Sequence, residues 1–264
     1  MDLEKQLFEV AMDAARDAGK RILRLFNDKE ISVRRKFDYP GSIVTNADKE
    51  AERLIVGRIK KTRIKCTVRS EEAGTLRFGS SDILWAVDPL DGTFNYAARI
   101  PYFGVSIGVL VRGRARLGAI YNPILDEMFT AIRGDGARLN GKRIHVSRAR
   151  SLRDSKLIFE WWHPEPSIPE PLALAARIYR YTRSLRSPGS VALNLCSVAS
   201  GRFDGLITVY RKAPVYETTA GCLIAEEAGA RLTSSIGESW ESYAHSVIVG
   251  GTPIHRQLMR LIHG

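Results

Sequence analysis

Residues 85–95 have the sequence WAVDPLDGTFN. The apolar start predicts a short buried strand, and the Asp-Pro and Asp-Gly pairs that follow predict a tight turn. Gly92 and Thr93 then begin a predicted helix. Asp88 and Asp91 therefore lie three residues apart at the end of a strand, beside the N–H groups of a helix start.

This arrangement has a chemical interpretation and a structural one. Carboxylates at a strand end bind hard divalent cations such as Mg²⁺, and the N–H groups at a helix start bind phosphate oxygens. Metal ligands beside a phosphate cradle are typical of metal-assisted phosphate hydrolysis. In the structural alternative, Asp91 is simply the N-cap of the helix. The segment alone leaves both interpretations open.

Three other acidic positions are candidates for the same site. Glu71 and Glu72 follow a strand-like run at 65–68, Asp48 follows another short run, and Glu217 begins an apolar helix. Each also has a structural alternative. A Glu-Glu pair is commonly a solvated surface, Asp48 is a candidate N-cap, and Glu217 is a favourable first-turn charge.

Hydrophobic spacing indicates the elements around these positions. Helices are predicted at residues 3–27, 48–60, 172–181, 190–200, 218–228 and 253–262. Strands are predicted at residues 83–87, 104–111, 114–121, 127–133, 138–146, 156–159, 206–209 and 246–250, and a loop at 34–41. Helices and strands mix in both halves, and the pattern changes near residue 150. We therefore expect one α/β domain over 1–264, with lobes of about 1–149 and 150–264.

The composition limits the partners of the chain. Its 264 residues include 40 Lys and Arg against 29 Asp and Glu, a net charge of +11, which favours anionic partners. No apolar run approaches the roughly 18–20 residues of a membrane helix, and no signal peptide is visible, so we expect a cytoplasmic protein without a membrane partner. Three widely spaced cysteines indicate neither disulfides nor zinc. Abundant charge and only two glutamines favour a heat-adapted source.

Five segments, taken in order, resemble the motifs of the inositol monophosphatase superfamily. This superfamily includes inositol-phosphate phosphatases, archaeal-type fructose-1,6-bisphosphatases and nucleotide 3′-phosphatases. The segments are VTNAD at 44–48, SEE at 70–72, DPLDGTFN at 88–95, GDGARLNG at 134–141 and RSPGSVAL at 186–193. Phe94 replaces a common Thr and Val191 replaces an Ala. The resemblance covers nearly the whole chain.

The resemblance implies a layered α/β/α/β/α sandwich of the inositol monophosphatase and fructose-1,6-bisphosphatase type. It further implies an Mg²⁺-dependent phosphoric monoester hydrolase that forms a homodimer. Three helix starts, near Thr93, Ser190 and Glu217, are expected to converge on the active site. The loop that contains Lys36 resembles the family's mobile lid.

The resemblance also implies roles for individual residues. The implied ligands of two or three Mg²⁺ ions are Glu71, Asp88, the carbonyl of Leu90, Asp91 and Glu217. Thr93, paired with Asp48, would orient and deprotonate the attacking water, which the first ion and its ligand Glu71 activate. The implied substrate-binding residues are Gly92, Thr93, Gly189 and Ser190, with Tyr210, Arg211 and Lys212 farther along the chain.

One departure from the family pattern bears directly on activity. The family's W-D-x-A-A element is YETTA at 216–220, so Glu217 replaces the Asp of the second metal site. The extra methylene moves the carboxylate by roughly 1.5 Å. Because Mg²⁺ demands near-ideal octahedral geometry, we expect weaker binding of the second ion. Thr219 also adds bulk where the family has a small Ala.

A second departure from the family pattern bears on the substrate. Inositol-selective relatives have a Glu where this chain has Tyr210, followed here by Arg211 and Lys212. Cations at this point favour a substrate with a second phosphate, because a distal phosphate needs an Arg or Lys clamp. Fructose 1,6-bisphosphate fits this pattern. Because archaeal-type relatives often act on both substrates, the resemblance implies release of phosphate from inositol 1-phosphate, fructose 1,6-bisphosphate or both. The alternative substrates are 3′-phosphoadenosine 5′-phosphate and NADP(H), whose base could stack on Trp161 or Trp162.

A hypothesis from another class is a weakened or inactive homologue that acts as an RNA-binding or regulatory module. The net charge of +11 and Glu217 motivate it. Against it, the chain has no RNA- or DNA-binding motif and its arginines are scattered rather than arranged in a stripe. The sequence therefore favours a phosphorylated small molecule over nucleic acid as the partner.

Overall fold

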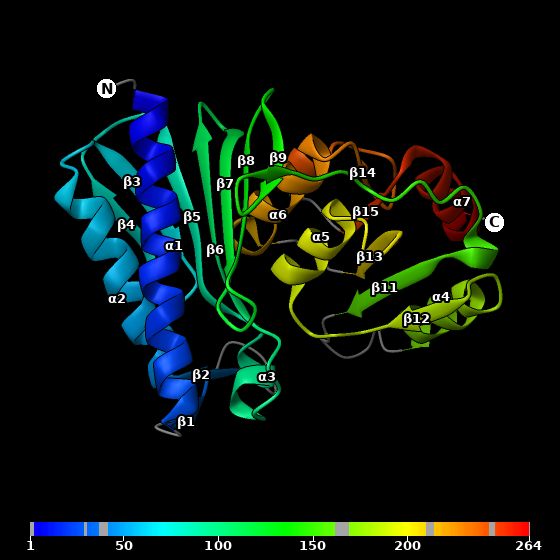
Figure 1. Ribbon diagram of the computed structural model, residues 1–264, viewed down its shortest axis with the longest axis horizontal. Coiled ribbons are helices and arrows are strands. Elements are labelled where there is room, and N and C mark those ends of the chain that lie inside the picture. Colours follow the sequence, from blue (N-terminus) through cyan, green and yellow to red (C-terminus); the bar gives the residue numbers. More distant parts are fainter. Residues whose placement is uncertain are drawn as a thin grey trace.

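The computed structural model describes residues 3–28, 31–36, 42–161, 169–209, 214–242 and 246–263, and its layers are visible in Figure 1. The first sheet has the strand order β10-β9-β8-β7-β6-β5-β3-β4. Its strands are β3 (Cys66–Ser70), β4 (Gly74–Phe78), β5 (Ile83–Asp91), β6 (Gly104–Val111), β7 (Arg114–Asn122), β8 (Glu127–Ile132), β9 (Gly136–Leu139) and β10 (Lys142–Arg143). Neighbouring strands are antiparallel except β3 and β5, which are parallel.

The second sheet has the strand order β12-β11-β13-β15-β14. Its strands are β11 (Lys156–Trp161), β12 (Ser184–Arg186), β13 (Gly205–Val209), β14 (Arg231–Ser234) and β15 (Val247–Gly250). A separate antiparallel pair consists of β1 (Val33–Arg35) and β2 (Ile43–Thr45).

Seven α-helices are described in these ranges. They are α1 (Leu3–Asn27), α2 (Asn46–Lys61), α3 (Thr93–Ala97), α4 (Pro169–Tyr179), α5 (Val191–Ala199), α6 (Val215–Glu227) and α7 (Thr252–His263), with short 3₁₀ turns at Leu152–Asp154 and Trp240–Ser242. None of the described helices is both long and apolar enough to cross a lipid bilayer.

Three hydrophobic clusters hold the layers together. The first packs α1 and α2 on one face of the eight-stranded sheet and includes Trp85, Ile107 and Leu117. The second buries α5 and α6 between the two sheets, against side chains such as Phe129. The third joins α4 and α7 to the outer face of the second sheet, around Phe159. The architecture is therefore the expected α/β/α/β/α sandwich, and it places α5 and α6 at its centre (Figure 1).

Two glycines let α6 approach the first sheet closely. Gly108 and Gly118 are paired across β6 and β7. A Cβ at Gly108 would lie 2.6 Å from Cγ2 of Thr219, and one at Gly118 would lie 2.8 Å from the carbonyl oxygen of Ala220. The extra bulk of Thr219, one turn from the start of α6, therefore packs over Gly108, which has no side chain.

Most predicted elements are confirmed with some shifts of their ends. The single strand predicted at 138–146 was wrong, because the chain turns back after β9 and pairs with it as the short antiparallel strand β10. The helix at 3–27 and the 104–121 hairpin form as expected. The loop predicted at 34–41 was wrong at its start, because β1 pairs with β2. The sequence predicted a strand ending at residue 87, but β5 continues through both aspartates. It does so because its pairing with β6 resumes after an irregularity. The first sheet uses residues 66–143 and the second 156–250; the division into lobes stays a prediction.

Candidate active site

The carboxylates of β5 are placed by an irregularity in the strand. The register with β6 shifts between Asp88, which faces Ser106, and Asp91, which faces Gly104. Such shifts re-aim side chains at the ends of paired strands. The Leu90 N–H donates to Oδ1 of Asp88 over 3.0 Å, and both aspartates are buried. A buried carboxylate costs free energy unless it is hydrogen-bonded or paired with a cation, so both aspartates need partners inside the protein.

Gly92 makes the change from strand to helix. Its φ of 91° is left-handed, and a Cβ there would lie 2.9 Å from the carbonyl oxygen of Tyr102. Gly92 is the N-cap of α3, and no side chain caps that helix. The structural alternative, in which Asp91 caps the helix, was therefore wrong. The Thr93 hydroxyl lies 3.1 Å from Oδ1 of Asp48 and 3.0 Å from the Leu90 carbonyl oxygen.

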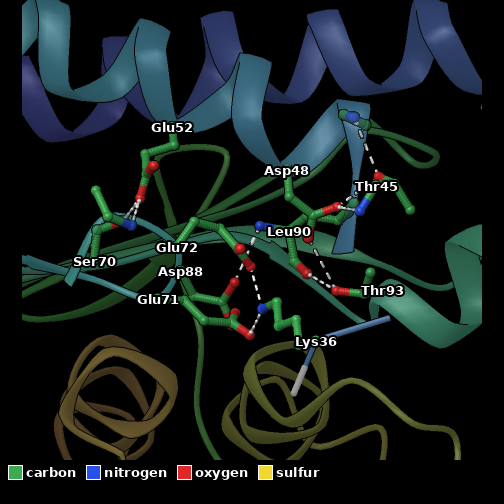
Figure 2. Close-up of polar contacts among 12 residues, drawn as sticks. Lys36, Thr45, Asp48, Glu52, Ser70, Glu71, Glu72, Asp88, Leu90 and Thr93 are labelled. Atoms are coloured by element: carbon green, nitrogen blue, oxygen red, sulfur yellow. Dashed lines mark hydrogen bonds and ion pairs between the residues drawn. The ribbon is translucent and has the colours of Figure 1, made fainter. Parts of the chain in front are cut away.

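Asp48 uses one carboxylate oxygen to stabilise the start of α2 and the other to contact Thr93. Thr45 caps α2, and its N–H donates to Oδ2 of Asp48 over 2.8 Å in a capping box. The other carboxylate oxygen faces Thr93, as Figure 2 shows. Burial raises the pKa of Asp48 to about 6, although the bonds from Thr45 act to lower it. Asp48 is thus a buried base held in one orientation.

Glu71 and Glu72 follow β3 and are held by Lys36. The Lys36 ammonium lies 2.9 Å from Oε1 of Glu71 and also bonds Oε1 of Glu72 (Figure 2). Burial raises the pKa of Glu72 to about 7, against the bond from Lys36. Burial acts to lower the pKa of Lys36, but the two carboxylates raise it above its ordinary value. Lys36 therefore reaches the site, while residues 37–41 of the expected lid lie outside the described residues.

Asp91 is turned toward the start of α5. Ser190, the N-cap of α5, donates its hydroxyl to Asp91, and the N–H groups of Val191 and Ala192 donate over 3.2 and 2.9 Å. A helix N-terminus stabilises a negative charge at this point. Even so, burial raises the pKa of Asp91 to about 7.

Asp88 is buried, and its burial and three other acidic residues affect the pKa of its carboxyl group. Burial raises it well above its ordinary value, and the charges of Glu71, Asp91 and Glu217 raise it further. Glu217 lies in the first turn of α6. The start of α5 thus bonds Asp91, and the first turn of α6 carries a charge that acts on Asp88.

The donors fit Mg²⁺ in chemistry. They are carboxylate oxygens and the Leu90 carbonyl, the hard ligands that Mg²⁺ prefers. In the described part of the chain, no three metal-type side chains are close enough to hold an ion as they are placed. Two of these carboxylates have partners within the protein. Lys36 bonds Glu71, and the Ser190 hydroxyl and two N–H groups at the start of α5 bond Asp91.

Three predicted substrate residues are not placed. Tyr210, Arg211 and Lys212 lie outside the described residues, as does Trp162. Ser190 bonds Asp91, and Gly189 directly precedes it in the chain. Sequence reasoning assigned no role to Glu160, a buried carboxylate at the end of β11 that accepts the Gly189 N–H over 2.7 Å. Its one signal was an acidic residue ending the apolar run 157–159.

The fold and the buried carboxylates define the architecture of a phosphatase-type protein, and comparisons with known proteins agree. The model of the inositol monophosphatase family matches residues 3–263. The chain is 38% identical to Nus factor SuhB of Pasteurella multocida (strain Pm70) over 227 residues, 84% of this chain and 83% of that protein. The chain belongs to the inositol monophosphatase family.

Solved structures agree over nearly the whole length. The extragenic suppressor protein suhB from Bartonella henselae has a TM-score of 0.91 at 33% identity, with 97% of this chain and 98% of that chain covered. The inositol monophosphatase from Anabaena (Nostoc) sp. PCC 7120 has a TM-score of 0.85 at 30% identity, with 98% and 96% covered.

Proposed function

We propose that the protein is an Mg²⁺-dependent phosphomonoester hydrolase. The observation that supports it best is the pair of buried carboxylates Asp88 and Asp91 at the end of β5, next to the contact between Thr93 and Asp48. Buried carboxylates are costly unless they are paired or neutralised, and such groups are concentrated at functional sites. Family membership supports the same reaction class.

Five residues would hold two metal ions. Glu71, Asp88 and the Leu90 carbonyl would hold a first ion, and Asp88, Asp91 and Glu217 a second. When bound, Mg²⁺ supplies an activated water and neutralises the charge that develops on the phosphoryl group.

Thr93 and Asp48 would handle the proton. The Thr93 hydroxyl, held by Asp48, can accept a hydrogen bond from the attacking water and orient it. Asp48, whose pKa burial raises to about 6, is a base near neutral pH. The Gly92 and Thr93 N–H groups would hold phosphate oxygens at the start of α3.

The variant Asp88→Asn tests this proposal. It keeps the shape of the side chain but removes a charge shared by both proposed metal positions, so phosphate release should fall by at least about a hundredfold. Circular dichroism should show an unchanged fold. Normal turnover in Asp88→Asn would rule out the metal assignment.

A substrate panel separates the members of the reaction class. Phosphate release would be measured with fructose 1,6-bisphosphate, inositol 1-phosphate, 3′-phosphoadenosine 5′-phosphate and NADP⁺, with and without Mg²⁺, at moderate and high temperature. We expect the first two to be preferred, because the resemblance to archaeal-type relatives implies activity on both. Fructose 1,6-bisphosphate should exceed inositol 1-phosphate, because Arg211 and Lys212 follow Tyr210 in the chain and would clamp its second phosphate. Preference for the two nucleotides would favour the nucleotide phosphatase instead.

A regulatory function is the second candidate. Relatives such as those of Pasteurella multocida and Escherichia coli are named Nus factor SuhB, and the net charge of +11 suits an anionic partner. This candidate predicts binding to random RNA that weakens steeply as salt increases. Binding that is absent at low ionic strength would exclude it. We further propose a cytoplasmic homodimer, which light scattering tests as a doubled mass.

A further inference from the structure

Glu160 is the centre of a buried polar network beside the proposed site. Its side chain is 8% exposed and lies at the end of β11. Oε1 accepts the Gly189 N–H over 2.7 Å and the Asn194 side-chain amide over 2.8 Å, and Oε2 accepts the Ser187 hydroxyl over 2.9 Å. One carboxylate therefore satisfies three donors, two of which belong to the segment 187–190.

Two residues that follow β5, Asn95 and Tyr102, are also bonded to this network. The Asn95 side-chain amide donates to the carbonyl oxygen of Pro188 over 2.7 Å and to that of Tyr102 over 2.8 Å. The Tyr102 hydroxyl donates to Oδ1 of Asn194 over 2.8 Å, which closes the network back to Glu160. The segment is therefore fixed between residues that follow β5 and a residue that ends β11.

The segment 187–190 leads directly to the donors of Asp91. Gly189 has a left-handed φ of 86° and is followed by Ser190, which caps α5 and bonds Asp91. The N–H groups of the next two residues complete the cradle of Asp91. The segment 187–190 is therefore continuous with the donors that hold Asp91.

We propose that Glu160 is a positioning residue that sets the segment 187–190, and through it Asp91, for binding of Mg²⁺ and the phosphate group. This rests on the proposed function, since it deepens the role of that same site. Glu160 has no contact with a reacting atom in the proposal. It acts through the Gly189 N–H and the start of α5.

The network shows which property of Glu160 matters. A glutamine can place its oxygen on the Gly189 N–H and the Asn194 amide, and its NH₂ group can donate to the Ser187 hydroxyl, which then acts as acceptor. A methionine fills the same volume but accepts neither N–H group, and so leaves buried donors unpaired. The pair of variants Glu160→Gln and Glu160→Met therefore separates hydrogen-bond acceptance from bulk.

The experiment measures Mg²⁺ binding by calorimetry, hydrogen exchange of residues 187–192, and kcat and KM. We expect Glu160→Met to weaken Mg²⁺ binding by about 10- to 100-fold and to speed exchange in 187–192, because unpaired buried donors are costly. KM should rise, and Glu160→Gln should stay within about threefold of the natural protein in every readout. Unchanged Mg²⁺ binding and exchange in Glu160→Met, or equal losses in both variants, would overturn the proposal.

Two further variants keep the test decisive. Asp204→Leu removes another buried carboxylate, which accepts the Lys156 N–H at the opposite end of β11, and should lower stability without changing Mg²⁺ affinity. If Glu160→Met does not fold, Tyr102→Phe removes one hydroxyl of the network without opening a cavity and should weaken Mg²⁺ binding by about 2- to 10-fold. Unchanged binding in Tyr102→Phe would then overturn the proposal.

The two proposals fail in different ways. If the natural protein binds no Mg²⁺ and releases no phosphate, the proposed function fails. Hydrogen exchange of residues 187–192 still tests the positioning role of Glu160 in that case, because it needs neither metal nor substrate.

Discussion

The Lys36 ammonium shares Oε1 of Glu71 with the proposed Mg²⁺ site. It also bonds Glu72, and its side chain is only 12% exposed. A cation beside the carboxylate both competes for the oxygen and repels a divalent ion. We therefore predict that Lys36→Met tightens Mg²⁺ binding by about tenfold, measured by calorimetry. Lys20→Met, an exposed lysine on α1, is the control; weaker Mg²⁺ binding in Lys36→Met would instead assign Lys36 to the support of the bound ligand.

Glu217 departs from the family by one methylene in the first turn of α6. We predict that Glu217→Asp keeps or raises activity and tightens Mg²⁺ binding about threefold, because it restores the shorter reach that an octahedral site needs. The Mg²⁺ dependence of phosphate release measures this. Glu226→Asp, near the other end of α6, should leave the Mg²⁺ dependence unchanged. A loss of activity in Glu217→Asp would mean that the site is built around the longer side chain.

At the scale of elements, the packing of α6 on β6 and β7 decides where Glu217 lies. Gly118 faces the backbone of α6, so a Cβ there forces the helix to move away from the sheet. We predict that Gly118→Ala lowers the free energy of unfolding by about 2 kcal/mol in urea titrations. It should also weaken Mg²⁺ binding, because α6 carries Glu217.

Gly57 provides the matched control for that substitution. It lies inside α2, and a Cβ there would meet nothing within 4 Å. Gly57→Ala should therefore raise the free energy of unfolding by about 0.5–1 kcal/mol, since alanine favours the helix. If both variants destabilised the protein equally, the close approach of α6 would not explain the result.

At the scale of the whole molecule, His255 makes stability depend on pH. It is a buried residue of α7, with Nε2 2.9 Å from the Thr233 hydroxyl, and Nδ1 has no partner in the described residues. Burial, with a contribution from Arg231, lowers the pKa of His255 to about 4. Between about pH 6.5 and pH 4 the unfolded chain thus binds more protons at this residue, so stability is lost as the pH falls.

The variant His255→Gln should remove this dependence. We predict that the change in unfolding free energy between pH 7 and pH 5 differs between the two proteins by about 2 kcal/mol. Burial raises the pKa values of Asp48, Glu72 and Asp91, and these groups act on stability in the opposite direction. Their contributions are present in both proteins, so the comparison isolates His255. His263→Gln, an exposed residue of α7, is the control and should show no such difference.

Ion pairing also connects distant parts of the chain. Arg133, which directly follows β8, pairs with Glu226 of α6 over 3.2 Å and with Glu241 over 2.8 Å. Networks of this kind contribute more to stability at high temperature, because the desolvation penalty of charged groups falls. They suit the expected heat-adapted source, which stays a prediction.

Local patterns were sufficient for most elements and for the acidic positions. The 3.6-residue spacing of α1 and the hairpin of β6 and β7 depend on neighbours in the chain, so they could be predicted directly. β1 could not, because its three exposed residues form a strand only by pairing with β2. The role of Glu160 was also beyond local reasoning, because its partners lie 27 to 34 residues away.

The sequence by itself determined the family, the layered fold and the identity of the acidic residues, because residue types and their spacing carry that information. Only the tertiary structure decided what those residues contact. It brought Lys36 onto Glu71, turned Asp91 into the start of α5, and joined Asn95 to the segment held by Glu160. These contacts connect residues that are far apart in the chain, and the packing of the two sheets around α5 and α6 is what brings them within hydrogen-bond distance.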